Sequence, residues 1–345
     1  MAVSLKKINE QVIVITGATS GVGLVTARQA AQRGAKLVLA ARNEPALKQL
    51  AAELTGRGAE VVHVVADVGD EKQVRAIAEA AVMRFGGFDT WINNAGVSIY
   101  GRAEDVPLAD QKRLFDTNFW GVVNGSLVAV EHLRKGGGAL INIGSEVSDV
   151  AVPLQGIYSA SKHAVKGFTD ALRLELEHDN APVSVTLVKP AGLDTPYLPH
   201  AKNYLEVEPR LAPPVYAPEI AASAILYAAQ RPRRDVYVGG AAKFASATNR
   251  FAPRTTDWLL RKTMFWMQRT DRPARPRNEN ALYDAGGDLQ ERHGADTRVR
   301  EWSLYTGASI HPRITGAVML GLLFAAGYWI TSQPPRRRSL VPSLW

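Results

Sequence analysis

The sequence predicts an α/β protein: a three-layer, doubly wound sandwich around a parallel seven-stranded sheet, with a mostly helical or irregular C-terminal extension. Two observations predict it. Short β-branched runs alternate with longer stretches of helical period between residues 11 and 240, as in consecutive βαβ units. Most of these runs are apolar nearly throughout, which is typical of strands covered by helices on both faces. A chain of 345 residues, 46% of them hydrophobic, can bury such a core.

Seven runs are the expected strands, and right-handed crossovers through the intervening helices give the doubly wound order. They cover residues 11–16, 36–41, 61–66, 89–93, 139–144, 183–188 and 235–239. The stretch between residues 195 and 219 contains six prolines, which exclude a continuous helix. We expect this stretch to form a lid over the site.

We expect three parts in the chain: a main domain over residues 1–245, an extension over 246–312, and a hydrophobic segment with a basic tail over 313–345. In the extension, residues 255–268 predict an amphipathic helix. It packs on the main domain or on another subunit, or lies on a membrane surface as the alternative. Residues 269–294 have the Arg, Pro, Gly and Asp content of a solvated linker.

Composition excludes several kinds of site and partner. The chain has no cysteine, so disulfides, thiolate nucleophiles and Cys-based metal sites are excluded, and the scattered histidines predict no other metal site. The net charge of +8 comes mostly from the tail, because residues 1–250 hold 27 Lys and Arg against 25 Asp and Glu, whereas 251–345 hold 14 against 8. We therefore expect no nucleic-acid binding by the main body; binding through the tail stays a minor alternative.

The segment 314–330 carries no charge and precedes three consecutive arginines, at 336–338. It is nearly long enough to cross a bilayer, and it predicts membrane association, with a helix buried against the main domain as the alternative. The N-terminus leads directly into the first strand without the apolar region of a secretory signal. We therefore expect the main domain to lie in the cytoplasm.

A glycine-rich turn follows the first strand. Residues 16–23 read TGATSGVG and open into a helix. Glycines allow a tight turn and the close approach of a pyrophosphate, whose charge is met by the free N–H groups at the helix start. Such turns also occur for steric reasons, but the position after the first strand favours a dinucleotide.

The end of the second strand distinguishes between cofactors. An acidic residue there accepts from a ribose 2′-OH, whereas an arginine binds a 2′-phosphate. Arg42 follows Ala41 here without a carboxylate, which favours NADP(H), although an ordinary exposed arginine is the alternative. Asp67 closes the third strand, where it is expected to bond the adenine amino group, to cap the following helix, or both.

Tyr158 and Lys162 are four residues apart in a segment of helical period, so they share one helix face. An adjacent ammonium favours the phenolate of a tyrosine, which makes Tyr158 a candidate proton donor to a carbonyl that receives a hydride. Ser145 follows a strand, where its hydroxyl can hold and polarise the same carbonyl. Asn118 lies among apolar residues, and a backbone cap or a water chain behind Lys162 would satisfy its amide.

Over about residues 10–240 these motifs, in this order, resemble the short-chain dehydrogenase/reductase family. The segment 93–96, Asn-Asn-Ala-Gly, fits the family's motif after the fourth strand. The resemblance implies a Rossmann-like fold and a catalytic tetrad of Asn118, Ser145, Tyr158 and Lys162. In it Tyr158 is the acid/base, Lys162 binds the nicotinamide ribose and lowers the tyrosine pKa, Ser145 positions the substrate oxygen, and Asn118 supports a proton relay through water.

The expected cofactor contacts lie along the carboxyl ends of the strands. They are Gly17, Thr19, Ser20, Gly21, Val22, Gly23, Arg42, Asp67, Val68, Asn94, Ala95, Gly96, Tyr158, Lys162, Pro190 and Thr195. The chain departs from the family at one point, because Ala191 stands between Pro190 and Gly192 where Pro-Gly is usual. Thr195 is the expected contact to the carboxamide or the pyrophosphate.

The leading hypothesis is an NADP(H)-dependent oxidoreductase that interconverts a carbonyl and a secondary alcohol; the alternative is a non-catalytic dinucleotide sensor or scaffold. Residues 147–157 and the proline-rich stretch are expected to frame a pocket for an apolar small molecule. Its possible aromatic contributors are Trp91, Tyr100, Tyr197 and Tyr204, with Glu146 and Asp149 beside it as solvated carboxylates. By resemblance, the chain is expected to form a homodimer or homotetramer through the helices that carry Asn118 and Tyr158.

Overall fold

A computed structural model of the chain describes residues 3–286, 289–294, 298–311 and 315–316. The chain divides into two compact units, Met1–Thr306 and Gly307–Trp345. The hydrophobic segment expected to associate with a membrane, 314–330, lies outside the described residues except for 315 and 316. Among the described residues, no helix has both the length and the apolar character that a membrane crossing requires.

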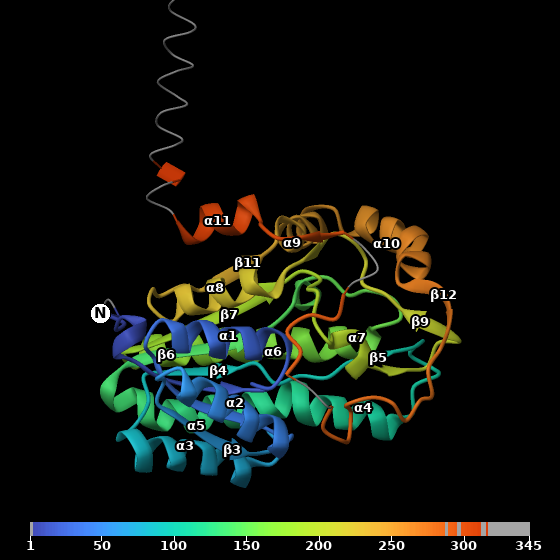
Figure 1. Cartoon of the computed structure of the whole chain (residues 1–345). Coiled ribbons are helices and arrows are strands. Elements are labelled where there is room, and N and C mark those ends of the chain that lie inside the picture. The colour runs from blue at the N-terminus through green and yellow to red at the C-terminus, as the bar shows by residue number, and fades with distance from the viewer. Residues whose placement is uncertain (1–2, 287–288, 295–297, 312–314, 317–345) are drawn as a thin grey trace, which may run out of the picture. The chain divides into compact units, whose positions relative to one another are not determined.

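The first unit is built on a seven-stranded parallel sheet in the order β11-β7-β6-β4-β1-β2-β3 (Figure 1). Its strands are β1 (Val12–Thr16), β2 (Lys36–Ala41), β3 (Val61–Val65), β4 (Thr90–Asn93), β6 (Gly138–Ile143), β7 (Val183–Pro190) and β11 (Asp235–Val238). Each predicted strand is confirmed to within two residues at either end, because nearly continuous apolar runs leave no other way to be buried.

Helices cover both faces of the sheet (Figure 1). On one face α1 packs against α8, and on the other α3 packs against α5. The helices of the main domain are α1 (Gly21–Gln32), α2 (Glu44–Gly56), α3 (Glu71–Phe85), α4 (Leu108–Phe115), α5 (Gly121–Gly136), α6 (Gly156–His178), α7 (Tyr197–His200) and α8 (Pro218–Ala228). Short turns of helix are η1 (Ile8–Glu10), η2 (Asp116–Trp120) and η3 (Glu146–Ser148).

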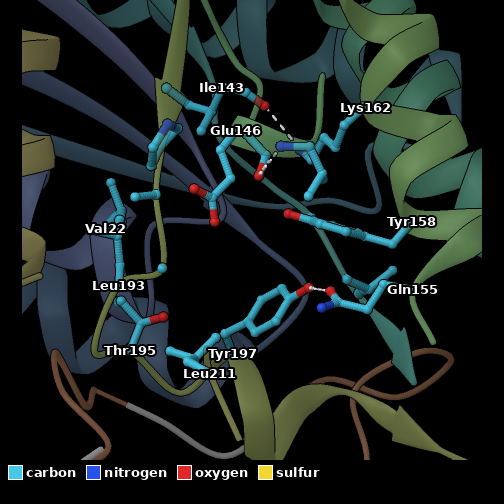
Figure 2. Close-up of a pocket in the computed structure, with 18 of the residues that line it drawn as sticks. Val22, Ile143, Glu146, Gln155, Tyr158, Lys162, Leu193, Thr195, Tyr197 and Leu211 are labelled. Carbon is cyan, nitrogen blue, oxygen red and sulfur yellow. Dashed lines mark hydrogen bonds between the residues drawn. The ribbon is translucent and has the colours of Figure 1, made fainter. Parts of the chain in front are cut away.

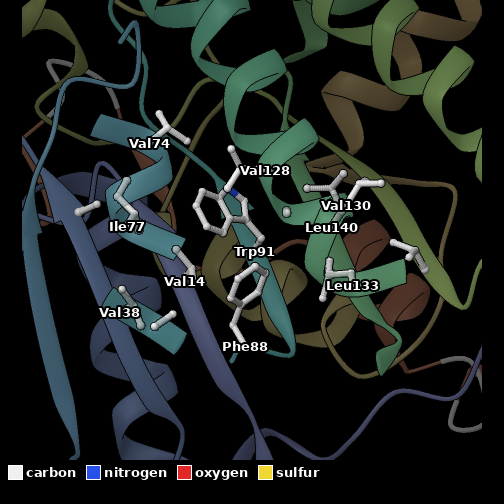
Figure 3. Packing of buried hydrophobic residues seen from close by; sticks show 14 of the residues in the cluster. Val14, Val38, Val74, Ile77, Phe88, Trp91, Val128, Val130, Leu133 and Leu140 are labelled. Atoms are coloured by element: carbon white, nitrogen blue, oxygen red, sulfur yellow. The ribbon is translucent and has the colours of Figure 1, made fainter. Parts of the chain in front are cut away.

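The core beneath α3 and α5 is centred on Trp91, which is fully buried (Figure 3). Its ring lies 5.4 Å from that of Phe88, and its indole nitrogen donates to Asn93 Oδ1 at 2.8 Å. The expectation that Trp91 contributes to the substrate pocket is therefore wrong. Side chains alternate between the faces of a strand, and in β4 this residue points into the layer between sheet and helix.

The proline-rich stretch forms short elements rather than one helix: α7, β8 (Lys202–Asn203), β9 (Val207–Pro209) and β10 (Val215–Tyr216). The strand β8 pairs with β5 (Ile99–Tyr100), which fixes the stretch beside the loop that follows β4. Adjacent strands β1 and β4 mark the point at which the order of the sheet reverses, and ligands of such folds bind outside the carboxyl ends of the strands there.

The extension begins with two helices, α9 (Gly240–Phe251) and α10 (Pro253–Met267), the second of which confirms the predicted amphipathic helix. Strand β12 (Arg269–Pro273) then pairs with β9, and β13 (Val299–Arg300) pairs with β10. Helix α11 (Leu304–Ile310) follows. Within 269–294, the described residues 269–286 and 289–294 therefore differ from the solvated linker expected of them: despite their polar composition, backbone hydrogen bonds hold them to the main domain.

Candidate active site

The glycine-rich turn at the end of β1 has the geometry that its sequence predicts. Gly17 has φ +64°, in the left-handed region that favours glycine. A Cβ on Gly23 would lie 2.1 Å from the carbonyl oxygen of Gly17, so no larger residue fits there. The turn thus brings the first residues of α1 close to the strand ends, as the approach of a pyrophosphate requires.

Asn94 holds this turn in place from the end of β4. Its Nδ2 donates to the carbonyl oxygens of Thr16 at 3.0 Å and Gly17 at 3.1 Å. The hydroxyl of Thr16 in turn accepts from the backbone N–H groups of Asn94 and Ala95. The motif after the fourth strand therefore holds the glycine-rich turn after the first strand in place.

Helix α6 carries Tyr158 and Lys162 on one face, as their spacing predicts. The Lys162 ammonium donates to the carbonyl oxygen of Ile143 at 2.9 Å and lies 5.8 Å from the centroid of the Tyr158 ring. Figure 2 shows the Tyr158 hydroxyl pointing into the cavity that this face borders. The first turns of α6 thus carry both side chains, and the carbonyl of Ile143 at the end of β6 holds the Lys162 ammonium.

Burial is the main influence on both pKa values. It raises the pKa of Tyr158 to about 12, although the Ser145 and Tyr197 hydroxyls beside it lower the value. It lowers the pKa of Lys162 to about 8. Burial therefore outweighs the lowering of the tyrosine pKa that the resemblance implies for Lys162: it disfavours both charged forms, and Tyr158 is a neutral phenol at neutral pH.

Ser145 lies at the end of β6, next to Tyr158. Its hydroxyl accepts from the backbone N–H of Val147 at 3.3 Å and so caps the short helix η3. Its own backbone N–H donates to Ser148 Oγ at 3.1 Å. These bonds fix the backbone of Ser145 just after the carboxyl end of β6.

Asn118 is fully buried in η2, a single turn of π-helix between α4 and α5. Such turns are rare in proteins as a whole, but many of those that occur lie at functional sites. Its Oδ1 accepts from Val97 N at 2.8 Å, and its Nδ2 donates to Val97 O at 2.9 Å and to Ser161 Oγ at 3.2 Å. Protein groups therefore satisfy the amide, as expected, with the loop after β4 as the main partner.

The cavity beside the tetrad has a volume of about 250 Å³. The predicted residues on its wall are Gly17, Ser20, Gly21, Val22, Asn94, Ala95, Gly96, Ser145, Tyr158, Lys162, Pro190 and Thr195. Asn118 and Gly23 stand behind this wall. The inserted Ala191 lies on it with Pro190 and Gly192, and Thr195 approaches α1, since a Cβ on Gly21 would lie 3.0 Å from that of Thr195.

Polar groups line the substrate side of this cavity as well as apolar ones. Tyr197 donates to Gln155 at 2.8 Å, and its ring lies 5.6 Å from that of Tyr158. Glu146 is half-buried: it points into the cavity (Figure 2), where burial raises its pKa to about 7. Asp149 is not solvated as expected, because it pairs with the buried Lys189 at 3.0 Å.

Two residues on the substrate side of the cavity could not be predicted from the sequence. Met264 and Gln268, at the end of α10, line the cavity. Gln268 donates to Pro153 O at 2.9 Å, so this end of the helix packs on the main domain, while Trp266 stays 60% exposed. Tyr204, a predicted contributor, donates instead to Asp110. Only long-range packing of the extension could have placed α10 here.

A second, smaller cavity adjoins the first at the ends of β2 and β3. The predicted residues on its wall are Gly17, Thr19, Ser20, Arg42, Asp67, Val68, Ala95 and Gly96. Asp67 pairs with Arg113 and accepts from Gly69 N at 3.0 Å. It does not cap α3, as one alternative supposed, because Asp70 accepts from the N–H groups at that helix start.

Residues 281–286, which we name the strap, form the outer wall of this second cavity. Ala281, Ala285 and Gly286 line it, and the guanidinium of Arg42 donates to the carbonyl oxygens of Ala281 at 2.6 Å and Tyr283 at 2.9 Å. Beyond the strap, Leu289 N donates to Thr19 O and Gly21 N donates to Gln290 O. The extension therefore runs beside the glycine turn.

The two adjoining cavities bring together the groups that bind a dinucleotide. One end offers the tetrad, the middle offers a turn where only glycine fits at position 23, and the other end offers a cationic side chain. This is the donor set that a nicotinamide dinucleotide needs: backbone N–H groups for the pyrophosphate and a polar or charged group for the adenosine ribose.

Comparisons with known proteins agree with this geometry. Residues 11–204, more than half of the chain, match the family profile described as short chain dehydrogenase. A curated protein of Bacillus subtilis, "Uncharacterized oxidoreductase YxnA", is 50% identical over 322 residues, which are 92% of this chain and 90% of the relative. This similarity extends into the extension that carries the strap.

Solved structures of the same fold bind either nicotinamide cofactor. A short chain dehydrogenase/reductase from Burkholderia phymatum in complex with NAD has a TM-score of 0.64 and 28% identity, covering 80% of this chain and 99% of its own. A short chain dehydrogenase from Burkholderia cenocepacia in complex with NADP has a TM-score of 0.63 and 26% identity, covering 74% and 99%. The chain belongs to the short-chain dehydrogenase/reductase family of oxidoreductases.

Proposed function

We propose that the protein is an NADP(H)-dependent oxidoreductase that interconverts a ketone and a secondary alcohol. The observation that carries the proposal is one cavity in which Ser145, Tyr158 and Lys162 face the glycine turn. A hydride acceptor and a proton donor must meet at one carbonyl, and this cavity offers a wall for each partner.

When bound, the nicotinamide supplies or removes the hydride. Tyr158 is protonated at neutral pH because burial raises its pKa to about 12, so its hydroxyl is ready to donate a proton to the carbonyl oxygen. Lys162 has a pKa of about 8, and its charged form stabilises the phenolate that remains. Ser145 donates a hydrogen bond that holds the same oxygen, and Asn118 positions the loop that backs Lys162.

The choice of NADP(H) rests on Arg42. Among the described residues no carboxylate forms an ion pair with this guanidinium, whose bonds go to neutral carbonyl oxygens. A phosphate dianion is a stronger acceptor than a carbonyl, so the 2′-phosphate of NADP(H) fits this place better than the hydroxyl of NAD(H). The Burkholderia cenocepacia structure, with NADP, supports the same choice, whereas the one with NAD shows that the fold accepts both.

The alternative of a sensor or scaffold without turnover is less well supported. A sensor needs the glycine turn and Arg42, but it has no use for a phenol and an ammonium 5.8 Å apart beside the nicotinamide end of the cleft. The cavity beyond Tyr158, bordered by Glu146, Tyr197 and Gln155, is also unexplained in a sensor.

The experiment that tests the proposal is steady-state turnover of a panel of ketones by the full-length chain, with NADPH and with NADH in parallel. We expect reduction of at least one ketone, with a kcat/KM for NADPH roughly ten- to a hundredfold above that for NADH. Tight binding of NADPH without oxidation by any ketone or any alcohol would instead support the sensor.

We also propose that the chain assembles into a dimer or tetramer through α5 and α6. Leu127 on α5 and Leu174 on α6 are 50% and 66% exposed, as large apolar side chains at an interface are in the isolated subunit. Light scattering at micromolar concentration should give at least twice the mass of the chain. A monomer mass would contradict the assembly and leave the proposed chemistry untouched.

A further inference from the structure

The strap holds the side chain that is proposed to select the cofactor. Arg42 Nη1 donates to Tyr283 O at 2.9 Å and to Leu282 O at 3.4 Å, and its Nη2 donates to Ala281 O at 2.6 Å. Three successive carbonyls of the strap thus surround one guanidinium. Burial lowers the pKa of Arg42, with Asp67 and Asp284 acting on it only at longer range.

Further bonds hold the strap along its length. Asn43 Nδ2 donates to Gly286 O at 2.6 Å, Arg113 Nε donates to Leu282 O at 3.1 Å, and the Tyr283 hydroxyl donates to Asp110 at 2.8 Å. Leu282 is fully buried among the side chains beside α4. Side chains of the main domain therefore hold the strap in a defined position.

The strap occupies the place that the 2′-phosphate would take. The carbonyl oxygens of Ala281, Leu282 and Tyr283 already accept from the Arg42 guanidinium. Ala281, Ala285 and Gly286 line the cavity between the strap and the ends of β2 and β3. The strap must therefore release Arg42 before a 2′-phosphate can bind this guanidinium.

We propose that Arg42 is the latch of the strap and that the 2′-phosphate of NADP(H) opens it. The proposal rests on the proposed function. A phosphate dianion is a better partner for a guanidinium than three carbonyls, so it takes the side chain and frees the strap. NAD(H) has no charge at this place, and the strap opposes its entry. Selection of the cofactor is thus coupled to movement of the strap.

The first test locks the strap, which the cysteine-free sequence makes simple. The double variant Asn43→Cys, Gly286→Cys replaces a pair in direct contact and forms a disulfide on oxidation. We expect the oxidised protein to lose NADPH binding, measured by cofactor fluorescence, at least roughly tenfold, and to regain it with reductant. The reduced variant is the matched control for folding. Equal association rates before and after reduction would overturn the gate.

The second test probes the latch in the unmodified chain by hydrogen exchange at the amides of Ala281 and Leu282, which donate to His200 O and Asn280 Oδ1. We expect 2′,5′-ADP to speed this exchange roughly tenfold, and 5′-ADP at equal occupancy to leave it unchanged. Arg42→Ala should show the fast exchange without nucleotide, whereas Arg33→Ala, on an exposed residue, should not.

The outcomes separate this inference from the proposed function. If NADPH binds no more tightly than NADH, the choice of cofactor is wrong and the latch falls with it. If NADPH is preferred but both nucleotides leave the strap amides protected, the cofactor choice stands and the latch is overturned.

A different observation carries a second inference, about the substrate. Glu146 follows Ser145 and points into the cavity opposite Val22 and Thr195 (Figure 2). None of the described residues forms a hydrogen bond or ion pair with its carboxylate, although Gln155 and Tyr197 nearby are bonded to each other. Once a substrate displaces water from this cavity, the carboxylate is costly unless the substrate supplies its partner.

We infer that the substrate is a ketone that carries a hydrogen-bond donor, a hydroxyl or an amine, near its carbonyl, and that Glu146 binds this donor. This inference rests on the proposed function and adds a polar group to the apolar substrate expected from the sequence. A site built to pair with a donor rejects analogues without one, because its buried acceptor is then left unpaired.

The test compares 2-hydroxyacetophenone with acetophenone, a pair that differs in one hydroxyl, in the wild type, Glu146→Gln and Glu146→Leu. We expect the wild type to prefer the hydroxy ketone roughly ten- to a hundredfold in kcat/KM, Glu146→Gln to keep part of this preference, and Glu146→Leu to lose it while still reducing acetophenone. If the ratio of the two kcat/KM values is equal in the three proteins, the role of Glu146 is overturned and the proposed function stands. If the wild type reduces no ketone at all, the proposed function is overturned.

Discussion

The two ends of the cleft are built in different ways. At the nicotinamide end, Ser145, Tyr158 and Lys162 come from a strand end and the helix after it, within the residues that match the family. At the adenosine end, the outer wall is the strap, from residues beyond that match, held by bonds that span about 240 positions in sequence. The difference teaches that the residues proposed for the chemistry are neighbours in the sequence, whereas the wall proposed to control access of the cofactor comes from the extension.

The largest expected effect is a loss of kcat from a substitution at the nicotinamide end of the cleft. Tyr158→Phe should lower kcat roughly 10²- to 10⁴-fold, because it removes the proton donor, and should leave the Kd for NADPH nearly unchanged. Steady-state kinetics and fluorescence titration measure the two effects. Tyr197→Phe is the matched control, since its ring lies 5.6 Å away in the same cavity and it should keep most of the activity. Substantial turnover by Tyr158→Phe would remove this residue from the role of acid.

The next effect concerns the adenosine end. Arg42→Ala should remove most of the preference for NADPH, a loss of about 1.5–3 kcal/mol, while kcat with a saturating cofactor stays within a few-fold of the wild type. The ratio of kcat/KM for NADPH and NADH measures it. A preference that survives in Arg42→Ala would mean that another group reads the 2′-phosphate.

A third prediction concerns the turn between the two ends. A Cβ at Gly23 would lie 2.1 Å from Gly17 O and 2.6 Å from Asn94 Nδ2, so Gly23→Ala should destabilise the fold by about 1–3 kcal/mol and weaken both cofactors. Gly56→Ala is the control, because nothing lies within 4 Å of its Cβ. Thermal unfolding should separate the two variants; equal Tm values would show that the turn has more room than its geometry indicates.

The smallest effect is a pH dependence at the substrate side. Burial raises the pKa of Glu146 to about 7, so the carboxylate is ionised above this pH and protonated below it. If it binds a donor on the substrate, kcat/KM for the hydroxy ketone should fall several-fold below about pH 7. The limb should be absent in Glu146→Gln, which has no group to titrate there. The same limb in both proteins would assign it to another residue.

The sequence predicts the sheet and the shared helix face of Tyr158 and Lys162 well for the same physical reason. Strands such as β6 are apolar on both faces, and a spacing of four fixes Tyr158 and Lys162 on one side of α6 whatever surrounds them. Both signals are local. The departures come from burial and packing, because neither the high pKa of Tyr158 nor the core position of Trp91 follows from nearest neighbours in the chain.

The strap could not be predicted, because its bonds to Arg42 come from backbone carbonyls, which every residue possesses. Its Asp284 and Gly286, together with the Arg and Pro residues that precede it, resemble a solvated linker by composition alone. The one local signal was Ala281-Leu282-Tyr283, a short apolar run amid polar residues, of which two members are buried. Such a run is too short to identify its partner.

The most direct test of the central claim, that the tetrad reduces a ketone with NADPH, follows the hydride itself. The full-length chain is given a ketone and NADPH carrying deuterium at the transferred position. We expect one deuterium on the carbinol carbon of the product for each NADPH consumed, and no labelled alcohol from Tyr158→Phe over the same time. Consumption of NADPH without labelled alcohol, or labelled alcohol formed equally by Tyr158→Phe, would contradict the account.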